Sequence, residues 1–228
     1  MQKVAIVTGG ARGIGRGIVE NLSRDHAIAF TWRSTPPDAL AAALPDALPI
    51  QADLAAPDMA QEIVRQVIRR FGRIDVIVNN AGALLTDDVD DGQNFAVNVE
   101  APARLLEAAL PHLKTGASVI NISSVNAILP AMGAVSYSAS KAALNTWTKG
   151  IAKALGPRGI RVNAIAPGAI ERPESPRPPE LVAKFVELTA LGRSGVPADI
   201  AKVVRFLASD GADFITGEVI TVSGGYRL

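Results

Sequence analysis

Short runs of apolar residues, many of them β-branched, alternate along the chain with longer stretches of mixed polarity. Continuous apolar runs of this length are typical of strands that are buried on both faces of a sheet. The predicted strands are 4–7, 28–32, 49–52, 74–78, 118–122, 160–165 and 219–222. No internal repeat or long linker interrupts this order, so the pattern predicts a single domain, 1–228.

The stretches between these runs have the spacing of amphipathic helices. Apolar residues recur every three to four positions in 63–71 and again from Leu105 through Leu113, with polar residues on the other face. Pro102 predicts a kink or a fresh start near the beginning of the second helix. Strands that alternate with helices imply right-handed crossovers, and we therefore expect a doubly wound α/β fold. Its seven-stranded, mostly parallel sheet would carry helices on both faces.

The segment 171–180 departs from this alternation. It contains four prolines and five charged residues in ten positions, which excludes a core element. One interpretation is a plain exposed loop and the other is a mobile lid. We favour a lid within a short substrate loop at about 169–190, because the segment follows directly on the motif Pro167-Gly168 at the end of a predicted strand.

Composition narrows the function classes. The chain has 228 residues with a net charge of +1, so no overall field favours nucleic acid or a membrane surface. It has no apolar run of about 18 residues and no signal-peptide pattern, and we expect a cytoplasmic protein with neither of those partners. With no cysteine and two histidines, the chain excludes disulfides, cysteine nucleophiles and a thiolate or histidine-rich metal site, so no metal is predicted.

A glycine-rich loop, Thr8-Gly9-Gly10-Ala11-Arg12-Gly13-Ile14-Gly15, follows the first strand and opens a helix. Glycines at this junction allow a tight turn and a close approach of the backbone to a pyrophosphate, which the helix N-terminus then binds. The spacing is wider than Gly-x-Gly-x-x-Gly. The loop predicts a dinucleotide site formed by Gly9, Gly13, Ile14 and Gly15.

The end of the second predicted strand indicates which dinucleotide. A carboxylate is expected about 20 positions after the glycines to bind a ribose 2′-hydroxyl, but the chain has Arg33 and Ser34 there, and Arg12 lies in the glycine loop. An arginine fork suits a 2′-phosphate. We therefore predict NADP(H) in preference to NAD(H), the alternative being that Arg33 is a solvated loop residue.

A tyrosine and a lysine four residues apart supply candidate acid–base chemistry. Tyr137 and Lys141 would share one helix face, and a nearby cation can lower the phenol pKa from about 10 by ~1–3 units. Other candidate residues strengthen the functional interpretation of the tyrosine–lysine pair. Ser124, Asn98 and the motif 79–82 also fall at carboxyl ends of strands or on the helices that follow, where open parallel sheets bind ligands.

Taken together, these motifs resemble the classical short-chain dehydrogenase/reductase family, in particular its branch similar to 3-oxoacyl-carrier-protein reductases. The resemblance covers nearly the whole chain and includes 163–168, 191–193 and 222–225. It implies a Rossmann fold, a nicotinamide cofactor, a small-molecule carbonyl or alcohol substrate and a homotetramer or homodimer.

The resemblance also implies residue roles. Tyr137 would exchange a proton with the substrate oxygen, to which Ser124 would donate a hydrogen bond. Lys141 would lower the tyrosine pKa and hold the nicotinamide ribose, while Asn98 would hold a water linking Lys141 to solvent. Asp53 would contact the adenine. Further cofactor contacts are implied for Leu54, Asn80, Ala81, Gly82, Pro167, Gly168 and Ile170.

Two departures from the family pattern affect the pocket. Arg172 stands where the family often has a threonine that touches the nicotinamide carboxamide, so that contact is in doubt. The stretch 83–94 and the loop after Gly168 are shorter than usual, which predicts a more open substrate pocket.

Two other functions fit parts of the sequence. An epimerase or dehydratase of the extended branch shares the tyrosine–lysine pair, but its chain is longer and its glycine spacing differs. A non-catalytic dinucleotide sensor would keep the fold and lose part of the set Asn98, Ser124, Tyr137 and Lys141, all of which are present. The leading hypothesis is therefore an NADP-dependent carbonyl reductase.

Overall fold

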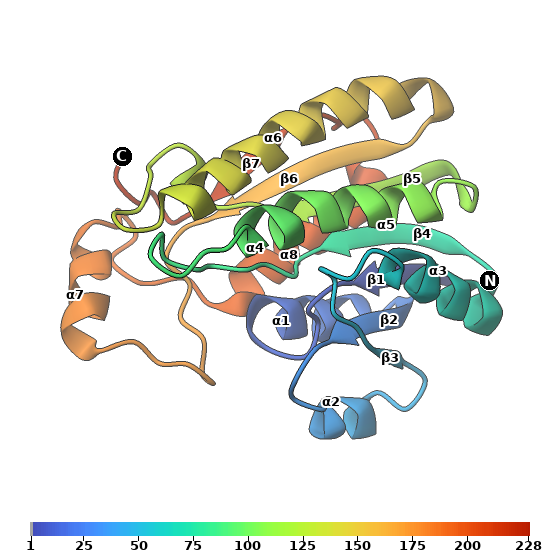
Figure 1. Ribbon diagram of the computed structural model, residues 1–228, viewed down its shortest axis with the longest axis horizontal. Coiled ribbons are helices and arrows are strands. Elements are labelled where there is room, and N and C mark those ends of the chain that lie inside the picture. The colour runs from blue at the N-terminus through green and yellow to red at the C-terminus, as the bar shows by residue number, and fades with distance from the viewer. Residues whose placement is uncertain (1) are drawn as a thin grey trace.

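A single parallel sheet forms the centre of the computed structural model, which describes residues 2–228. Within these residues the sheet has seven strands in the order β3-β2-β1-β4-β5-β6-β7, and each neighbouring pair is parallel. The strands are β1 (Lys3–Val7), β2 (His26–Trp32), β3 (Leu48–Gln51), β4 (Ile74–Asn79), β5 (Leu113–Ile122), β6 (Arg161–Pro167) and β7 (Val219–Val222). The predicted doubly wound fold is confirmed (Figure 1).

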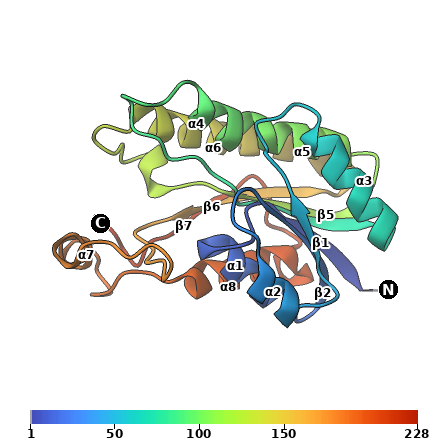
Figure 2. The ribbon, with the colours of Figure 1, turned by 60° about the horizontal axis from the view of Figure 1, so that its bottom comes forward.

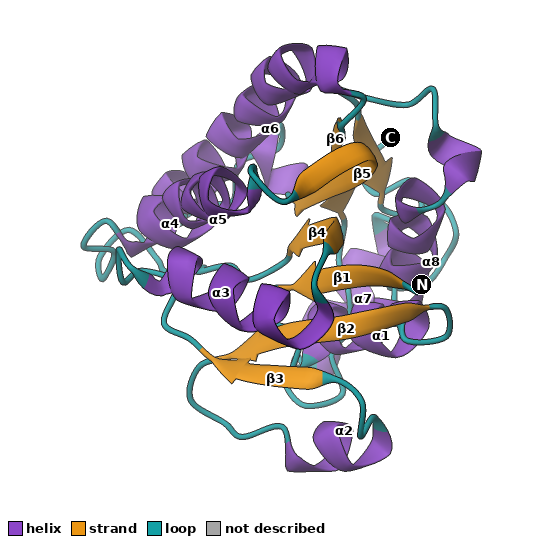
Figure 3. Ribbon diagram, turned by 90° about the vertical axis from the view of Figure 1, so that its right-hand side faces the viewer, coloured by secondary structure: helices purple, strands orange, loops and turns teal. Residues whose placement is uncertain are grey.

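Helices cover both faces of the sheet (Figures 2 and 3). They are α1 (Gly13–Leu22), α2 (Asp38–Ala43), α3 (Met59–Phe71), α4 (Gln93–Phe95), α5 (Ala101–Ala109), α6 (Val135–Leu155), α7 (Pro179–Glu187) and α8 (Pro197–Ala208). One layer contains α3, α5 and α6, and the other contains α1 and α8. Within the described residues, none of these helices combines the length and the apolar character needed to cross a bilayer.

The two layers explain why the strands are continuous apolar runs. Val4 and Ile6 of β1 pack into the core beneath α3 and α5, while Ala5 and Val7 pack into the core against α1 and α8. All four side chains are at most 2% exposed. A strand with both faces covered needs apolar residues at every position, rather than at alternate ones.

One helix boundary differs from the sequence prediction. The helix α5 ends at Ala109, and Leu113, which the spacing assigned to it, is the first residue of β5. Pro111 lies between the two elements and cannot supply the amide hydrogen that a continuing helix needs. The irregularity expected at Pro102 is observed as a change of helix type, because Pro102 lies in the first turn of α5, directly after a π-helical turn (Ala96–Glu100).

The predicted loop at about 169–190 also contains a helix. Pro179 begins α7, a position where its missing N–H costs nothing, and the prolines before it keep 171–178 irregular. The irregular part is held by a 2.7 Å ion pair between Arg177 and Glu171. Arg177 also lies over the Phe185 ring of α7, 5.2 Å from its centre. Figure 1 shows α7 beyond the carboxyl ends of the strands, at the opposite end from the N-terminus.

Candidate active site

The glycine loop between β1 and α1 is packed so tightly that side chains cannot replace its glycines. Gly9 and Gly13 have φ angles of +63° and +54°, which other residues rarely adopt. A Cβ atom on Gly15 would lie 2.1 Å from the carbonyl oxygen of Gly9. The loop therefore has the close packing expected of one that lets a phosphate approach the first turn of α1.

Hydrogen bonds of Thr8 and Asn80 connect this loop to the end of β4. The Thr8 hydroxyl oxygen accepts hydrogen bonds from the backbone N–H groups of Asn80 and Ala81, both at 3.0 Å. The Asn80 side chain donates to the carbonyl oxygens of Thr8 and Gly9, at 2.9 and 3.1 Å. The amide of Asn80 thus shapes the glycine loop itself. Sequence reasoning did not assign Thr8 a role, although it is the first polar residue after β1.

The residues around the loop fit a dinucleotide phosphate. The helix α1 has no acidic residue in its first turn and no side-chain hydrogen bond at its N-cap, so its N-terminal N–H groups are open to an anion. Arg12 and Arg33 are exposed, and within residues 2–228 neither guanidinium makes a hydrogen bond or ion pair. Thr31 of β2 links this strand end to the loop, because its hydroxyl oxygen accepts from the Gly9 N–H at 2.9 Å.

The predicted adenine side lies at the ends of β2 and β3. Ser34 and Asp53 are exposed there, and the Asp53 carboxylate accepts a hydrogen bond from the Ala55 N–H at 3.1 Å. Leu54 is half-buried, and its carbonyl oxygen accepts from Arg104 of α5 at 3.0 Å. These contacts fix the backbone at this edge and leave the second carboxylate oxygen of Asp53 without a protein partner within the described part of the chain.

Helix α6 carries Tyr137 and Lys141 on the face turned toward the sheet. Both side chains are buried, with 9% of Tyr137 and 4% of Lys141 exposed. The Lys141 ammonium lies 5.9 Å from the centre of the Tyr137 ring and donates a 2.9 Å hydrogen bond to the carbonyl oxygen of Ile122. The predicted sharing of one helix face is therefore observed.

Ser124 lies two residues beyond the end of β5 and faces the tyrosine. Its hydroxyl oxygen accepts a 3.1 Å hydrogen bond from the Asn126 N–H, which starts a short 3₁₀ turn and fixes the serine backbone. The same hydroxyl is close enough to the Tyr137 phenol to lower its pKa. Strand β5 and helix α6 thus bring Ser124, Tyr137 and Lys141 to one place, as the sequence predicted.

Burial is the main influence on both titratable groups. It raises the pKa of Tyr137 above its usual value, and the Ser124 hydroxyl and the Arg172 charge oppose this without reversing it. Burial also lowers the pKa of Lys141 to about 8. For Tyr137 the loss of solvation outweighs the opposing influences, so the net direction is upward, and the lowering expected from Lys141 stays a prediction.

Asn98 connects the tyrosine helix to the loop after β4. It lies in the π-helical turn, is 1% exposed, and donates hydrogen bonds to the Ala83 carbonyl oxygen and the Ser140 hydroxyl, both at 2.9 Å. Its Oδ1 accepts from the Ala83 N–H at 2.9 Å. Both side-chain N–H groups are thus engaged, so the water predicted for Asn98 would bind through an acceptor, either the remaining lone pair of Oδ1 or the main-chain carbonyl oxygen.

Two glycine-containing loops, after β4 and β6, carry the other predicted cofactor contacts. The first lies close to Asn98 and Lys141. A Cβ on Gly82 would lie 3.2 Å from Asn98 Oδ1 and 3.6 Å from Lys141 Nζ. Beyond β6, the Gly168 N–H donates to the Val222 carbonyl oxygen at 3.0 Å. Pro167 and Ile170 are buried on either side of Gly168. The loops after β1, β4, β5 and β6 therefore meet at one edge of the sheet.

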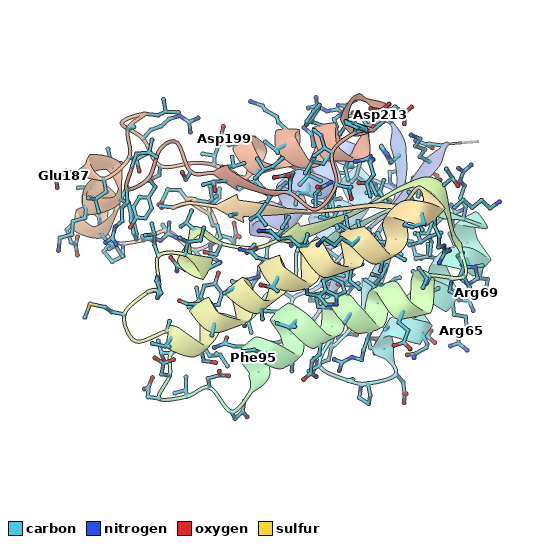
Figure 4. The ribbon with its side chains drawn as sticks, turned by 90° about the horizontal axis from the view of Figure 1, so that it is seen from above. Arg65, Arg69, Phe95, Glu187, Asp199 and Asp213 are labelled. Atoms are coloured by element: carbon cyan, nitrogen blue, oxygen red, sulfur yellow. The ribbon has the colours of Figure 1, made fainter. Side chains whose placement is uncertain are left out.

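The segment after β6 folds back over the glycine loop. The Glu174 carboxylate and the Arg172 methylenes lie 3.0 and 3.2 Å from the position of a Cβ on Gly13. This contact brings the segment to the glycine loop, and the more open substrate pocket stays a prediction. Figure 4 shows Glu187 of α7 and Asp199 of α8 toward this end of the molecule, and Arg65 and Arg69 of α3 at the other end.

Comparisons with known proteins agree with this geometry. A family model described as enoyl-(acyl carrier protein) reductase matches residues 9–227. A 3-oxoacyl-[acyl-carrier-protein] reductase of Thermotoga maritima is 36% identical over 98% of this chain and 97% of its own. A short-chain dehydrogenase/reductase of Serratia marcescens is 38% identical, with a TM-score of 0.93 over 99% of this chain and 98% of the other. A blue fluorescent protein from a metagenomic library, solved in complex with NADPH, is 37% identical, with a TM-score of 0.92 over the same shares.

These matches extend over nearly the full length of the chain. The chain belongs to the short-chain dehydrogenase/reductase family, and it is an oxidoreductase that acts on CH–OH or C=O groups.

Proposed function

We propose that the protein interconverts a carbonyl and an alcohol group of a small molecule, that it prefers NADP(H) to NAD(H), and that Tyr137 is its acid–base residue. One observation carries this proposal. The Tyr137 phenol faces the Ser124 hydroxyl, and the Lys141 ammonium lies 5.9 Å from the tyrosine ring. Both hydroxyl groups lie near the edge of the sheet where the glycine loop can hold a dinucleotide.

The arrangement suits proton transfer to a carbonyl oxygen. A bound nicotinamide ring supplies the hydride to the carbonyl carbon, or accepts it in the reverse direction. Ser124 and Tyr137 can both donate hydrogen bonds to the substrate oxygen, which stabilises the charge that develops there. The raised pKa of Tyr137 keeps its phenol protonated at neutral pH, so it can donate the proton during reduction. In oxidation, the buried Lys141 ammonium would stabilise the phenolate that accepts the alcohol proton.

The cofactor preference rests on the charges at the ends of β1 and β2. Arg12 and Arg33 are exposed there and are free of carboxylate partners within residues 2–228. A guanidinium fork binds a 2′-phosphate in two parallel hydrogen bonds, whereas NAD(H) offers only a hydroxyl at that place. The relative that was solved with NADPH supports the same choice.

Titration of the purified protein with NADPH and NADH, followed by cofactor fluorescence, tests the proposal. Tighter binding of NADPH, together with NADPH-dependent reduction of at least one member of a ketone panel, is the expected result. Preference for NADH would contradict the phosphate argument and leave the oxidoreductase class intact. Binding of neither dinucleotide would contradict the proposed cofactor.

We also propose that the protein assembles into homodimers or homotetramers. Phe214 is fully exposed and Phe206 of α8 is 45% exposed, and aromatic side chains are enriched in interfaces between protein chains. Light scattering coupled to gel filtration would show a mass of two or four chains, and a monomer mass at micromolar concentration would contradict the proposal.

A further inference from the structure

The segment between β6 and α7 presents two charges of opposite sign to the start of α1. Glu174 Oε1 lies 3.0 Å, and Arg172 Cδ 3.2 Å, from the position that a Cβ on Gly13 would take. The Ser175 N–H donates to the Arg172 carbonyl oxygen at 3.0 Å, so Arg172 and Glu174 belong to one tight turn. The two side chains therefore start from neighbouring positions of the same turn.

Neither charged side chain has a polar partner in the described part of the chain. Within residues 2–228, the side chains of Arg172 and Glu174 make no hydrogen bond and no ion pair, whereas the neighbouring Arg177 and Glu171 pair with each other at 2.7 Å. The Arg172 charge is near enough to Tyr137 to lower the tyrosine pKa. Arg172 thus lies near the start of α1, and its charge reaches the catalytic tyrosine.

The place that Glu174 occupies is suited to an anion. The first turn of a helix carries a partial positive charge and N–H groups without intrahelical partners. In α1 no acidic residue and no capping side chain satisfies them. The carboxylate of Glu174 therefore lies beside the place where the glycine loop would hold a pyrophosphate, and the two anions would repel each other there.

We propose that Arg172 is a further cofactor ligand that binds the pyrophosphate of the dinucleotide, and that Glu174 repels the same group. The proposal rests on the proposed function, since it assumes that a dinucleotide binds. Because the two residues share a turn, both side chains can reach the same pyrophosphate, which would attract Arg172 and repel Glu174. Cofactor affinity would then include the repulsion by Glu174.

The test compares ligands with and without a pyrophosphate. Isothermal titration of the full chain would use NADPH, 2′-phospho-ADP-ribose, which has the pyrophosphate but no nicotinamide, and adenosine 2′-monophosphate, which lacks both. The variants are Arg172→Ala and Glu174→Gln, with Glu187→Gln of α7 as a matched control for loss of one carboxylate charge. All three positions are exposed, and thermal melting checks that the variants fold.

Opposite effects are expected from the two variants. Arg172→Ala should weaken binding of both pyrophosphate ligands by about 10-fold or more, and reduce its dependence on salt, because a charge-assisted hydrogen bond is lost. Glu174→Gln should tighten binding of the same ligands by about 2- to 5-fold, since a neutral amide does not repel the pyrophosphate. Adenosine 2′-monophosphate should bind the variants and the wild type equally well.

The outcomes separate this proposal from the function on which it rests. Unchanged pyrophosphate affinities in Arg172→Ala and Glu174→Gln, with normal binding by the wild type, would overturn the proposal alone. Equal effects on adenosine 2′-monophosphate would also overturn it, because the charges would then act on the whole site and not on the pyrophosphate. Failure of the wild type to bind either NADPH or NADH would overturn the proposed cofactor and this proposal together.

Discussion

The Lys141 ammonium lies 5.9 Å from the centre of the Tyr137 ring, and it donates a hydrogen bond to the carbonyl oxygen of Ile122 at 2.9 Å. This hydrogen bond ties a buried charge on α6 to the carboxyl end of β5, the strand that also leads to Ser124. The lysine is therefore both a source of charge beside the phenol and a fixed link between the two elements that form the site.

The free energy of unfolding should rise with pH because of Lys141. Its pKa is about 8 in the folded protein and 10.5 when solvated, so burial of the charge costs folding energy below pH 8. Above pH 8 the folded state loses the proton while the unfolded state keeps it, and stability rises by up to about 1.4 kcal/mol per pH unit until the unfolded lysine also titrates. Urea unfolding of the wild type and Lys141→Met at pH 7 to 10 measures this rise.

The rise should be absent in Lys141→Met and intact in Lys149→Met, which removes an exposed lysine of the same helix. Equal pH slopes in the wild type and Lys141→Met would show that the lysine is not the group responsible.

Tyr137→Phe should abolish turnover and spare cofactor binding. The substitution removes only the hydroxyl, so the buried ring still packs in α6, while general acid–base catalysis worth roughly 10²–10⁴ in rate is lost. Steady-state kinetics with an accepted ketone and NADPH titration measure the two effects. Tyr226→Phe is the matched control, since it removes the hydroxyl of the other tyrosine. Turnover by Tyr137→Phe within tenfold of the wild type would contradict the acid–base role.

Arg33→Asp should weaken NADPH binding by about 10- to 100-fold and leave NADH binding unchanged or tighter. The arginine is exposed at the end of β2 and has no carboxylate partner in the described chain, so its charge is available to a 2′-phosphate that an aspartate would repel. Fluorescence titration with both cofactors measures the change, with Arg69→Asp of α3, at the far end of the molecule, as the control (Figure 4). Equal NADPH affinity in the wild type and Arg33→Asp would contradict the role of Arg33.

Sequence reasoning predicted the grouping of the candidate site residues because these residues follow strand ends. Apolar runs such as 74–78 mark a strand, and a parallel sheet places the residues after each run at one edge. The grouping of Ser124, Tyr137 and Lys141 follows from that rule and from the four-residue spacing on α6. The predicted sheet and the predicted edge are both observed.

Contacts between segments that are distant in the sequence could not be predicted from local patterns. The roles of Thr8 and Asn80 in holding the glycine loop depend on the side chains of two adjacent strands meeting, which no local pattern reports. The helix α7 was missed because prolines before it suggested a loop throughout. The raised pKa of Tyr137 depends on the extent of its burial, and sequence spacing indicated only the cation beside it.

Gly15→Ala should eliminate dinucleotide binding and destabilise the fold, because its added methyl group would lie 2.1 Å from the Gly9 carbonyl oxygen and 2.4 Å from the Asn80 amide nitrogen. Both atoms belong to the hydrogen-bonded structure that shapes the loop, so relief of the overlap requires the loop to move. Gly150→Ala in α6 is the matched control, since a Cβ there meets nothing within 4 Å. It should raise stability by about 0.5–1 kcal/mol through helix propensity. Thermal melting and NADPH titration of both variants measure these effects, and wild-type affinity in Gly15→Ala would show that the loop tolerates the displacement and that its close packing is not what binds the cofactor.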